Sequence, residues 1–308
     1  MTWFNRNRSV VLRGAGTLLA IILLAVLLYQ NGWDEVWAAL QRISLWNLAL
    51  AFACVVISRL LITARWHVLL RSGGISIPFK DTASLVFTGL FANNFLPTTI
   101  GGDVVRLAGA IQMGHDRAVC LASIAADRVV NMVGMSLAAP LGIWQLFQAG
   151  AIFQSAALAG IWQKGSDFVR RTLASFSLWL NKPSALLLAL GFALAHMFFS
   201  FSANFVLIEG LGESLPLWKL IGLMSLAYFV SLVPISINGY GVQELTVTYL
   251  LNQFGGVSLP VSATVAVLHR LLMMLVSLPG ALSLPGVMAG MDRSRQTGPG
   301  PSSEVDEP

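Results

Sequence analysis

The sequence has little charge. Asp, Glu, Lys and Arg make up 11% of its 308 residues, whereas hydrophobic residues make up 56%. An ordinary soluble domain carries about 25% charged residues, and a soluble chain of this size needs them to cover its surface. The mean hydropathy of +0.74 indicates that much of the surface faces something other than water. These values exclude a soluble enzyme or a disordered chain and leave a polytopic helical membrane protein.

Cysteine and the common catalytic motifs are also scarce. Cys54 and Cys120 lie in apolar runs, and neither has a second Cys or a His at ligand spacing, so neither a disulfide framework nor a metal site is supported. The sequence has no H-E-x-x-H, G-x-S-x-G or G-x-x-x-x-G-K-[ST] motif. We therefore expect no metal and no cofactor, and an enzyme is the weaker of the function classes.

Apolar runs of about 20 residues predict six full transmembrane spans. They cover residues 11–29, 45–63 (continuing toward Arg71), 118–140, 142–162, 184–208 and 261–281. Residues 1–291 then form one transmembrane domain. Residues 292–308 are rich in Gly, Pro and Ser, which predicts a disordered cytoplasmic tail.

Two further apolar segments are interrupted. Residues 78–113 and 217–254 each have an apolar arm, a break rich in Pro and Gly, and a shorter second arm. A break at membrane depth is tolerated only where it is buried in protein or lines a cavity. We therefore interpret each segment as a re-entrant hairpin of two broken helices.

The basic residues agree with this topology. With the N-terminus inside, fourteen Lys and Arg residues, among them Arg65 and Arg106, fall on the inner side, and only Arg42 and Lys219 fall outside. This asymmetry follows the positive-inside rule, which also accounts for the net charge of +5 better than nucleic-acid binding does. The prediction is a multi-pass protein of the bacterial inner membrane with both termini in the cytoplasm.

The two broken segments resemble each other. FLPTTIGGD at residues 95–103 and LVPISINGY at residues 232–240 share an apolar pair, then Pro, Ile three residues later and Gly five residues later. Each is followed by a span that contains an arginine, Arg128 or Arg270. Three full spans lie between the hairpins, so the hairpins enter from opposite faces. Inverted repeats with broken helices are typical of transporters, with the substrate site at the repeat interface.

The polar residues at membrane depth are the candidate substrate site. An arginine at the centre of a span costs about 2.5–3.5 kcal/mol on insertion scales, so it either serves a function or holds the bundle through an interhelical salt bridge. Glycines at a helix N-terminus let backbone N–H groups approach an anion. The predicted substrate-binding residues are Arg128, Arg270, Asp127, Asn94, Gly101, Gly102, Asp103, Arg106, Asn238, Gly239, Gly241 and Glu244.

Several of these residues have a second interpretation. Asp103 suits an N-cap as well as a ligand, and Arg106 suits either a headgroup contact or a positive-inside anchor at the inner interface. Adjacent residues in a helix point about 100° apart, so Asp127 and Arg128 need not pair with each other. Glu244 either pairs with a cation such as Arg270 or relays a proton.

At these residues the sequence resembles the lysylphosphatidylglycerol synthase/flippase transmembrane family, the membrane half of multiple peptide resistance factors, over nearly the whole chain. The matching positions are Asn93 or Asn94, Pro97, Gly102, Asp103, Arg106, Asp127, Arg128, Pro234, Gly239, Gly241, Glu244 and Arg270. The sequence departs from the family pattern at Asn131, where an acid often stands, and at His269, where Tyr is usual.

The resemblance implies lipid translocation. Synthase members carry a soluble aminoacyltransferase domain after the membrane part, whereas this sequence has a short tail there. The implied function is a flippase or lipid-linked transporter that moves an anionic headgroup. The alternatives are a membrane-embedded lipid-modifying enzyme and a membrane subunit that recruits a separate synthase. The expected partners are a phospholipid or lipid-linked substrate, a second copy of the chain or a lipid-synthesis enzyme, and no nucleic acid.

Overall fold

The computed structural model describes residues 38, 41–94, 96, 101–150, 182–232 and 239–287, and all the regular elements in these ranges are helices. Four of them are long and apolar enough to cross a membrane. They are α4 (Leu45–Ser72), α7 (Arg117–Gln148), α10 (Pro183–Gly210) and α13 (Leu259–Ser277), which continues as the 3-10 turn η5 (Leu278–Ala281). The prediction of an all-helical polytopic membrane protein is confirmed at this level.

The predicted boundary between spans at residues 140–142 is wrong. α7 is one continuous helix through Pro140 to Gln148. Membrane helices tolerate an internal proline, and the glycine that follows serves packing: a Cβ on Gly142 would lie 2.4 Å from the backbone oxygen of Gly222 in α11 (Leu217–Ser231). The predicted span 11–29, most of the predicted span 142–162 and the predicted tail 292–308 lie outside the described residues.

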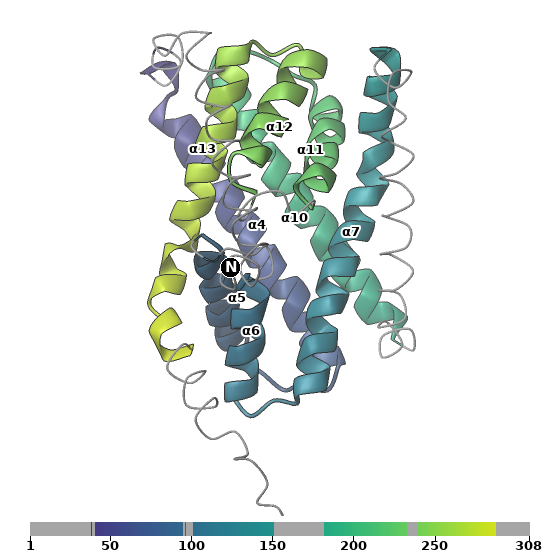
Figure 1. Ribbon diagram of the computed structural model, residues 1–308, viewed down its shortest axis with the longest axis vertical. Helices are drawn as coiled ribbons and strands as arrows, with labels where there is room; N and C mark the ends of the chain where they lie inside the picture. The colour runs from purple at the N-terminus through teal and green to yellow at the C-terminus, as the bar shows by residue number, and fades with distance from the viewer. Residues whose placement is uncertain are drawn as a thin grey trace, which may run out of the picture.

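Both broken segments contain two helical arms. The first consists of α5 (Phe79–Asn93) and α6 (Gly101–Gln112). The second consists of α11 and α12 (Val242–Leu250), which ends in the π-helical turn η4 (Leu251–Gly255). The predicted helical arms are confirmed, and residues 95, 97–100 and 233–238, which lie between them, are outside the described residues. Figure 1 places α5 and α6 in one half of the molecule and α11 and α12 in the other, beside the long helices.

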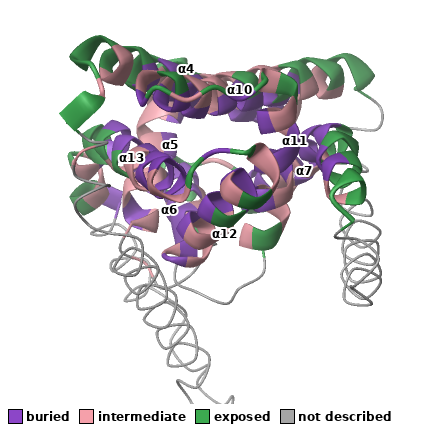
Figure 2. Cartoon of the chain, turned by 90° about the horizontal axis from the view of Figure 1, so that it is seen from above, coloured by how far each residue is buried: buried purple, intermediate pink, exposed green. Residues whose placement is uncertain are grey.

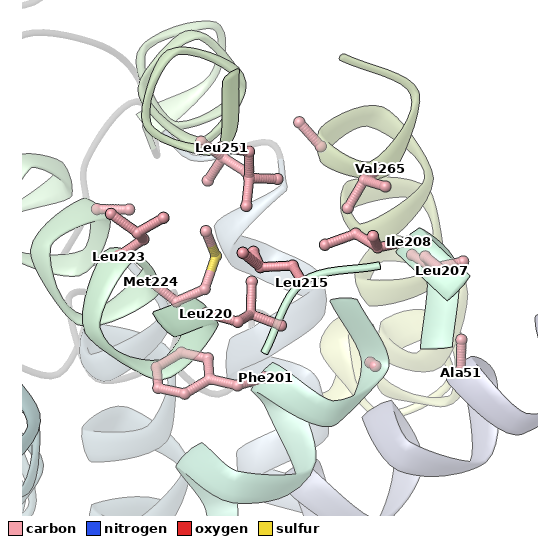
Figure 3. Close-up of a cluster of buried hydrophobic side chains, with 14 of the residues drawn as sticks. Ala51, Phe201, Leu207, Ile208, Leu215, Leu220, Leu223, Met224, Leu251 and Val265 are labelled. Carbon is pink, nitrogen blue, oxygen red and sulfur yellow. The ribbon is translucent and has the colours of Figure 1, made fainter. Parts of the chain in front are cut away.

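Packing and exposure fit a membrane environment. α4 and α10 pack along each other, and the largest apolar cluster joins them to α11, α12 and α13. Leu207, Leu215 and Leu220 lie at its centre (Figure 3). Figure 2 shows buried residues on the facing sides of the helices and exposed residues on the outer sides. Large apolar side chains such as Leu137 and Leu187 cover those outer sides, as expected of lipid-facing helices.

Candidate functional site

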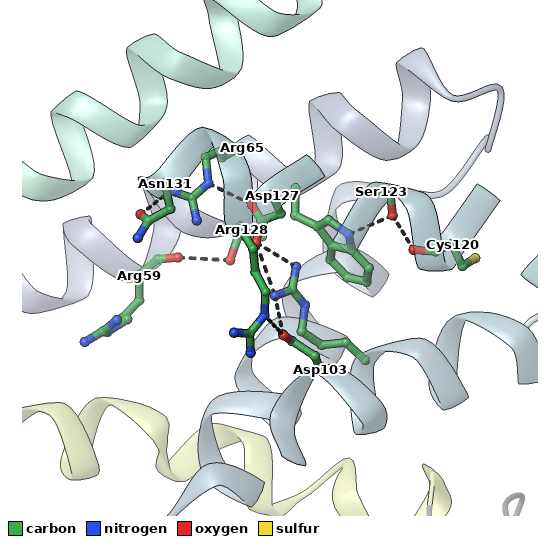
Figure 4. A network of polar contacts seen from close by, with 11 residues as sticks. Arg59, Arg65, Asp103, Cys120, Ser123, Asp127, Arg128 and Asn131 are labelled. Atoms are coloured by element: carbon green, nitrogen blue, oxygen red, sulfur yellow. Dashed lines mark hydrogen bonds and ion pairs between the residues drawn. The ribbon is translucent and has the colours of Figure 1, made fainter. Parts of the chain in front are cut away.

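The first hairpin contributes to a network of arginines and carboxylates. Asp103, the third residue of α6, accepts hydrogen bonds from Arg128 Nε of α7 and from Arg106 NH1, the latter at 3.2 Å. Asp127 of α7 accepts from Arg65 Nε of α4 at 2.7 Å and from both terminal nitrogens of Arg106 at 3.3 Å. Figure 4 shows Asp127 and Arg128 directed to different partners, as the helical geometry predicts.

The part of this network around Asp127 is withdrawn from solvent, whereas the side chain of Arg128 is 41% exposed. Asp127 and Arg65 are each 4% exposed, and Arg106 is 7% exposed. Asn131 Oδ1 accepts from Arg65 NH1 at 2.7 Å, and the Arg106 guanidinium lies 4.1 Å from the ring centroid of Trp66. Buried charges are tolerated when they are paired and hydrogen-bonded, and these contacts meet most of that requirement.

Two arginines assigned to the inner membrane side are buried within the helical bundle. α4 continues without interruption past residue 63, so Arg65 is inside a helix and is held by Asp127. Arg106 is buried between α6 and α7, where it pairs with Asp127. Arg65 was missing from the predicted site. The apolar run of the second predicted span continues toward Arg71, and this extension was the sequence signal that Arg65 lies within the span.

The glycines at the start of α6 serve the packing of the hairpin. Gly101 opens the helix, as predicted. The Gly102 N–H donates to Asn93 Oδ1 at 2.6 Å, and a Cβ on Gly102 would lie 2.4 Å from the Gly89 carbonyl oxygen. The position therefore requires glycine because the two arms touch there. Its N–H is occupied by the Asn93 side chain in this structure.

The second hairpin carries a simpler charged pair. Glu244 is the third residue of α12 and accepts from Arg270 Nε of α13, which confirms the predicted pairing. Arg270 also donates to Gln243 Oε1 at 2.9 Å, and its guanidinium lies 4.8 Å from the ring centroid of Tyr240. Gly241, the N-cap of α12, has a φ of 76°, a left-handed conformation that favours glycine.

The remaining predicted glycine also has a left-handed backbone: φ is 73° at Gly239. Asn238, the other predicted residue of this turn, lies outside the described residues. Among the residues that the structure describes, no three His, Cys, Asp or Glu side chains gather as ligands for a metal ion.

The two breaks meet at a polar junction, defined here as Asn94, Tyr240 and Ser277. The Tyr240 hydroxyl donates to Asn94 Oδ1 at 3.3 Å, and Asn94 Nδ2 donates to Ser277 Oγ at 2.8 Å. Because Tyr240 also stacks on Arg270, the junction joins the first hairpin to the charged pair of the second. Asn94 was predicted as a site residue. Tyr240 and Gln243 were not among the predicted site residues, because an aromatic residue and a glutamine near a helix break form no recognisable sequence motif.

Together these features define a multi-pass helical membrane protein whose interior holds arginine–carboxylate pairs at the meeting point of two broken helices. The chain belongs to the family described as "Lysylphosphatidylglycerol synthase TM region", whose model matches residues 14–163 and 153–280. The resemblance carried by the sequence motifs is thus confirmed.

A similar protein is the "UPF0104 membrane protein" of Methanothermobacter thermautotrophicus. It is 29% identical over 135 residues, which cover 43% of this chain and 37% of the relative. The similarity therefore spans well under half of the relative's length.

Proposed function

We propose that this protein is a lipid translocase that moves an anionic lipid headgroup across the bilayer, through the region where the two hairpins meet. The contact between Asn94 and Tyr240 carries the proposal. It joins the two breaks beside buried charged groups, within helices that are otherwise apolar. A polar path of this kind lowers the cost of carrying a charged headgroup past the hydrocarbon core.

The charged pairs support an inverted repeat of two re-entrant hairpins. Asp103 and Glu244 are each the third residue of the second arm. Each accepts from the Nε atom of an arginine in the next long helix, and the partners are 25 residues apart in the first half and 26 in the second. The same contact at the same place in both halves is expected if the halves share one architecture.

The proposed topology has both termini in the cytoplasm of a cell with a bacterial inner membrane. Removing the buried Arg65 and Arg106 from the inner set leaves twelve basic residues inside against two outside. The positive-inside asymmetry therefore persists after the correction.

Arginine exchange is the proposed mechanism. A phosphate carries the same charge-assisted, bidentate acceptor geometry as a carboxylate. A headgroup that reaches the junction replaces a carboxylate oxygen on Arg270 or Arg128. The released carboxylate then recaptures the arginine when the headgroup leaves.

Reconstitution tests the proposal. The full chain is placed in vesicles containing fluorescent phosphatidylglycerol, and outer-leaflet label is quenched over time. We expect the wild-type protein to accelerate movement between leaflets, and Arg128→Ala and Arg270→Ala each to abolish that acceleration. Arg117→Ala, which removes an exposed arginine, is the matched control.

The alternatives give different results in the same vesicles. A lipid product of changed mass would identify a lipid-modifying enzyme. A co-purifying synthase, with no lipid movement by this chain alone, would identify a recruiting subunit. Acceleration that both arginine variants retain would overturn the assigned site.

A further inference from the structure

Arg59 is a buried arginine that neither charged pair uses. It lies in the middle of α4 and is 8% exposed. Its backbone carbonyl accepts from Thr63 Oγ1 at 3.0 Å. Within the part of the chain that the structure describes, its guanidinium makes no hydrogen bond or ion pair, whereas Arg65, Arg106 and Arg270 each contact a carboxylate. Figure 4 shows the Arg59 side chain extending away from Asp127.

The groups around Arg59 do not neutralise it. Arg270, His269 and His196 all lie within electrostatic range of its guanidinium. His196 Nδ1 is engaged with Ser58 Oγ at 2.6 Å. Glu244, the carboxylate of this half, contacts Arg270 through Oε1. Two arginines therefore share this region with one carboxylate.

The buried charges of the described residues do not balance. Four arginines accompany three carboxylates, which leaves a net charge of +1: Arg59, Arg65, Arg106 and Arg270 with Asp103, Asp127 and Glu244. Arg128, which also pairs with Asp103, is not counted because its side chain is 41% exposed. A buried guanidinium without a partner is costly, and an anion that pairs with it removes much of that cost.

We infer that Arg59 and Arg270 bind a phosphate group between α4 and α13. The planar guanidinium matches two phosphate oxygens at once, and two such groups suit a phosphomonoester or phosphodiester better than a carboxylate. This inference rests on the proposed function only for the source of the phosphate. The same chemistry fits a lipid headgroup or free phosphate, and Arg59 lies outside both hairpins.

A binding measurement on the full chain in detergent tests the site without transport. Thermal unfolding is followed while dihexanoyl phosphatidylglycerol or inorganic phosphate is titrated, with dihexanoyl phosphatidylcholine as a probe whose phosphate is balanced by an attached cation. Wild-type protein should gain thermal stability with at least one anionic probe, because a ligand that binds only the folded state raises Tm. The probe that raises Tm shows whether the bound phosphate group comes from a lipid headgroup or from free phosphate.

The deciding variant is Arg59→Met, which keeps an unbranched apolar stem and removes the guanidinium group and its charge. Its apparent affinity for the active probe should fall by about tenfold or more, as expected for the loss of a charge-assisted contact. Its Tm without anion should equal or exceed that of wild type, because no unpaired charge remains buried. Arg117→Met should titrate like wild type.

Two results would overturn the inference: a wild-type Tm that responds to neither anionic probe, or an Arg59→Met titration that matches wild type. If Arg59→Met fails to fold, the same anion titration is carried out on Arg59→Lys. It retains the charge but loses the planar fork, so weaker binding supports the site and unchanged binding overturns it. Anion binding without lipid movement in vesicles would defeat the proposed function and leave this site standing.

Discussion

The two halves of the molecule contain the same acid–arginine pair in different surroundings. In the first half, Asp103 and Arg128 belong to a network in which a second carboxylate, Asp127, holds two further arginines. In the second half, Glu244 and Arg270 stand with Gln243 and Tyr240, and one oxygen of Glu244 is buried without a hydrogen-bond partner among the described residues.

This difference suggests separate roles for the two groups: the first network stabilises the helical bundle, and the second pair binds the ligand. The first network ties α4, α6 and α7 together through three ion-paired arginines, although Arg106 Nε is buried without a partner among the described residues, and this cross-linking suits a rigid anchor. The second pair contains a single carboxylate, and Arg270 lies within electrostatic range of Arg59, so an incoming anion displaces less there. We therefore expect substitutions in the first half to change stability most, and substitutions in the second half to change ligand handling most.

The largest effect is expected from Asp127→Asn. It removes the carboxylate shared by Arg65 and Arg106 and leaves both guanidinium groups buried. Breaking a buried ion pair by removing one partner costs about 3–5 kcal/mol. Thermal unfolding in detergent should show a large fall in Tm, or the variant should fail to accumulate. A Tm close to wild type would contradict the role of this network as the anchor.

Gly102→Ala comes next. The added Cβ would lie 2.4 Å from the Gly89 carbonyl oxygen, so the arms of the first hairpin must separate. Overpacking of this kind costs about 1–3 kcal/mol, and we expect the upper part of that range because the obstacle is backbone.

Gly191→Ala is the matched control for that change. Gly191 lies inside α10, and its added Cβ would meet nothing within 4 Å. An alanine there should raise stability by up to about 1 kcal/mol through helix propensity. Equal Tm values for the two alanine variants would show that the contact between the arms is not tight.

Glu244→Gln should have a smaller effect on stability. Glutamine keeps an oxygen for Arg270, which also retains Gln243 and the Tyr240 ring. We expect a loss of about 1–2 kcal/mol, the lower part of the range for an incompletely satisfied buried group. Anion affinity should rise, because the competing charge is gone. A Tm loss as large as that of Asp127→Asn would remove the proposed asymmetry between the halves.

Tyr240→Phe is expected to change stability least. It deletes the 3.3 Å contact to Asn94 and keeps the ring over Arg270. One neutral hydrogen bond contributes about 0.5–1.5 kcal/mol, so Tm should fall only slightly. Lipid movement should slow more than Tm suggests, because the two breaks lose their direct link. Transport that falls only in proportion to the folded fraction would argue against a functional junction.

Most of the fold follows from the sequence because it depends on local signals. Apolar length marks α4, α10 and α13, and Pro with Gly marks both breaks. The boundary placed at residues 140–142 fails for a physical reason. Pro140 and Gly142 are normally turn residues, yet inside a membrane helix the glycine provides close packing against α11.

The site was only partly predictable because pairing is a tertiary property. Asp103, Glu244 and both span arginines stand out by being charged at membrane depth. Nothing local reveals that Asp127 pairs with Arg65 across 62 residues. The motif alignment paired Gly102 with Gly239, whereas in the structure the matching contacts are made by Asp103 and Glu244, each with an arginine of the next long helix. Six residues separate Pro97 from Asp103 and ten separate Pro234 from Glu244, so no single offset finds both correspondences.

The most direct test is the rate at which fluorescent phosphatidylglycerol crosses vesicle membranes containing wild-type protein, Arg270→Gln or Arg117→Gln. The proposed function predicts rapid crossing with wild type and Arg117→Gln, and crossing at least about tenfold slower with Arg270→Gln, as expected for the loss of a charge-assisted contact. Wild-type vesicles no faster than protein-free ones, or equal rates for all three proteins, would contradict it.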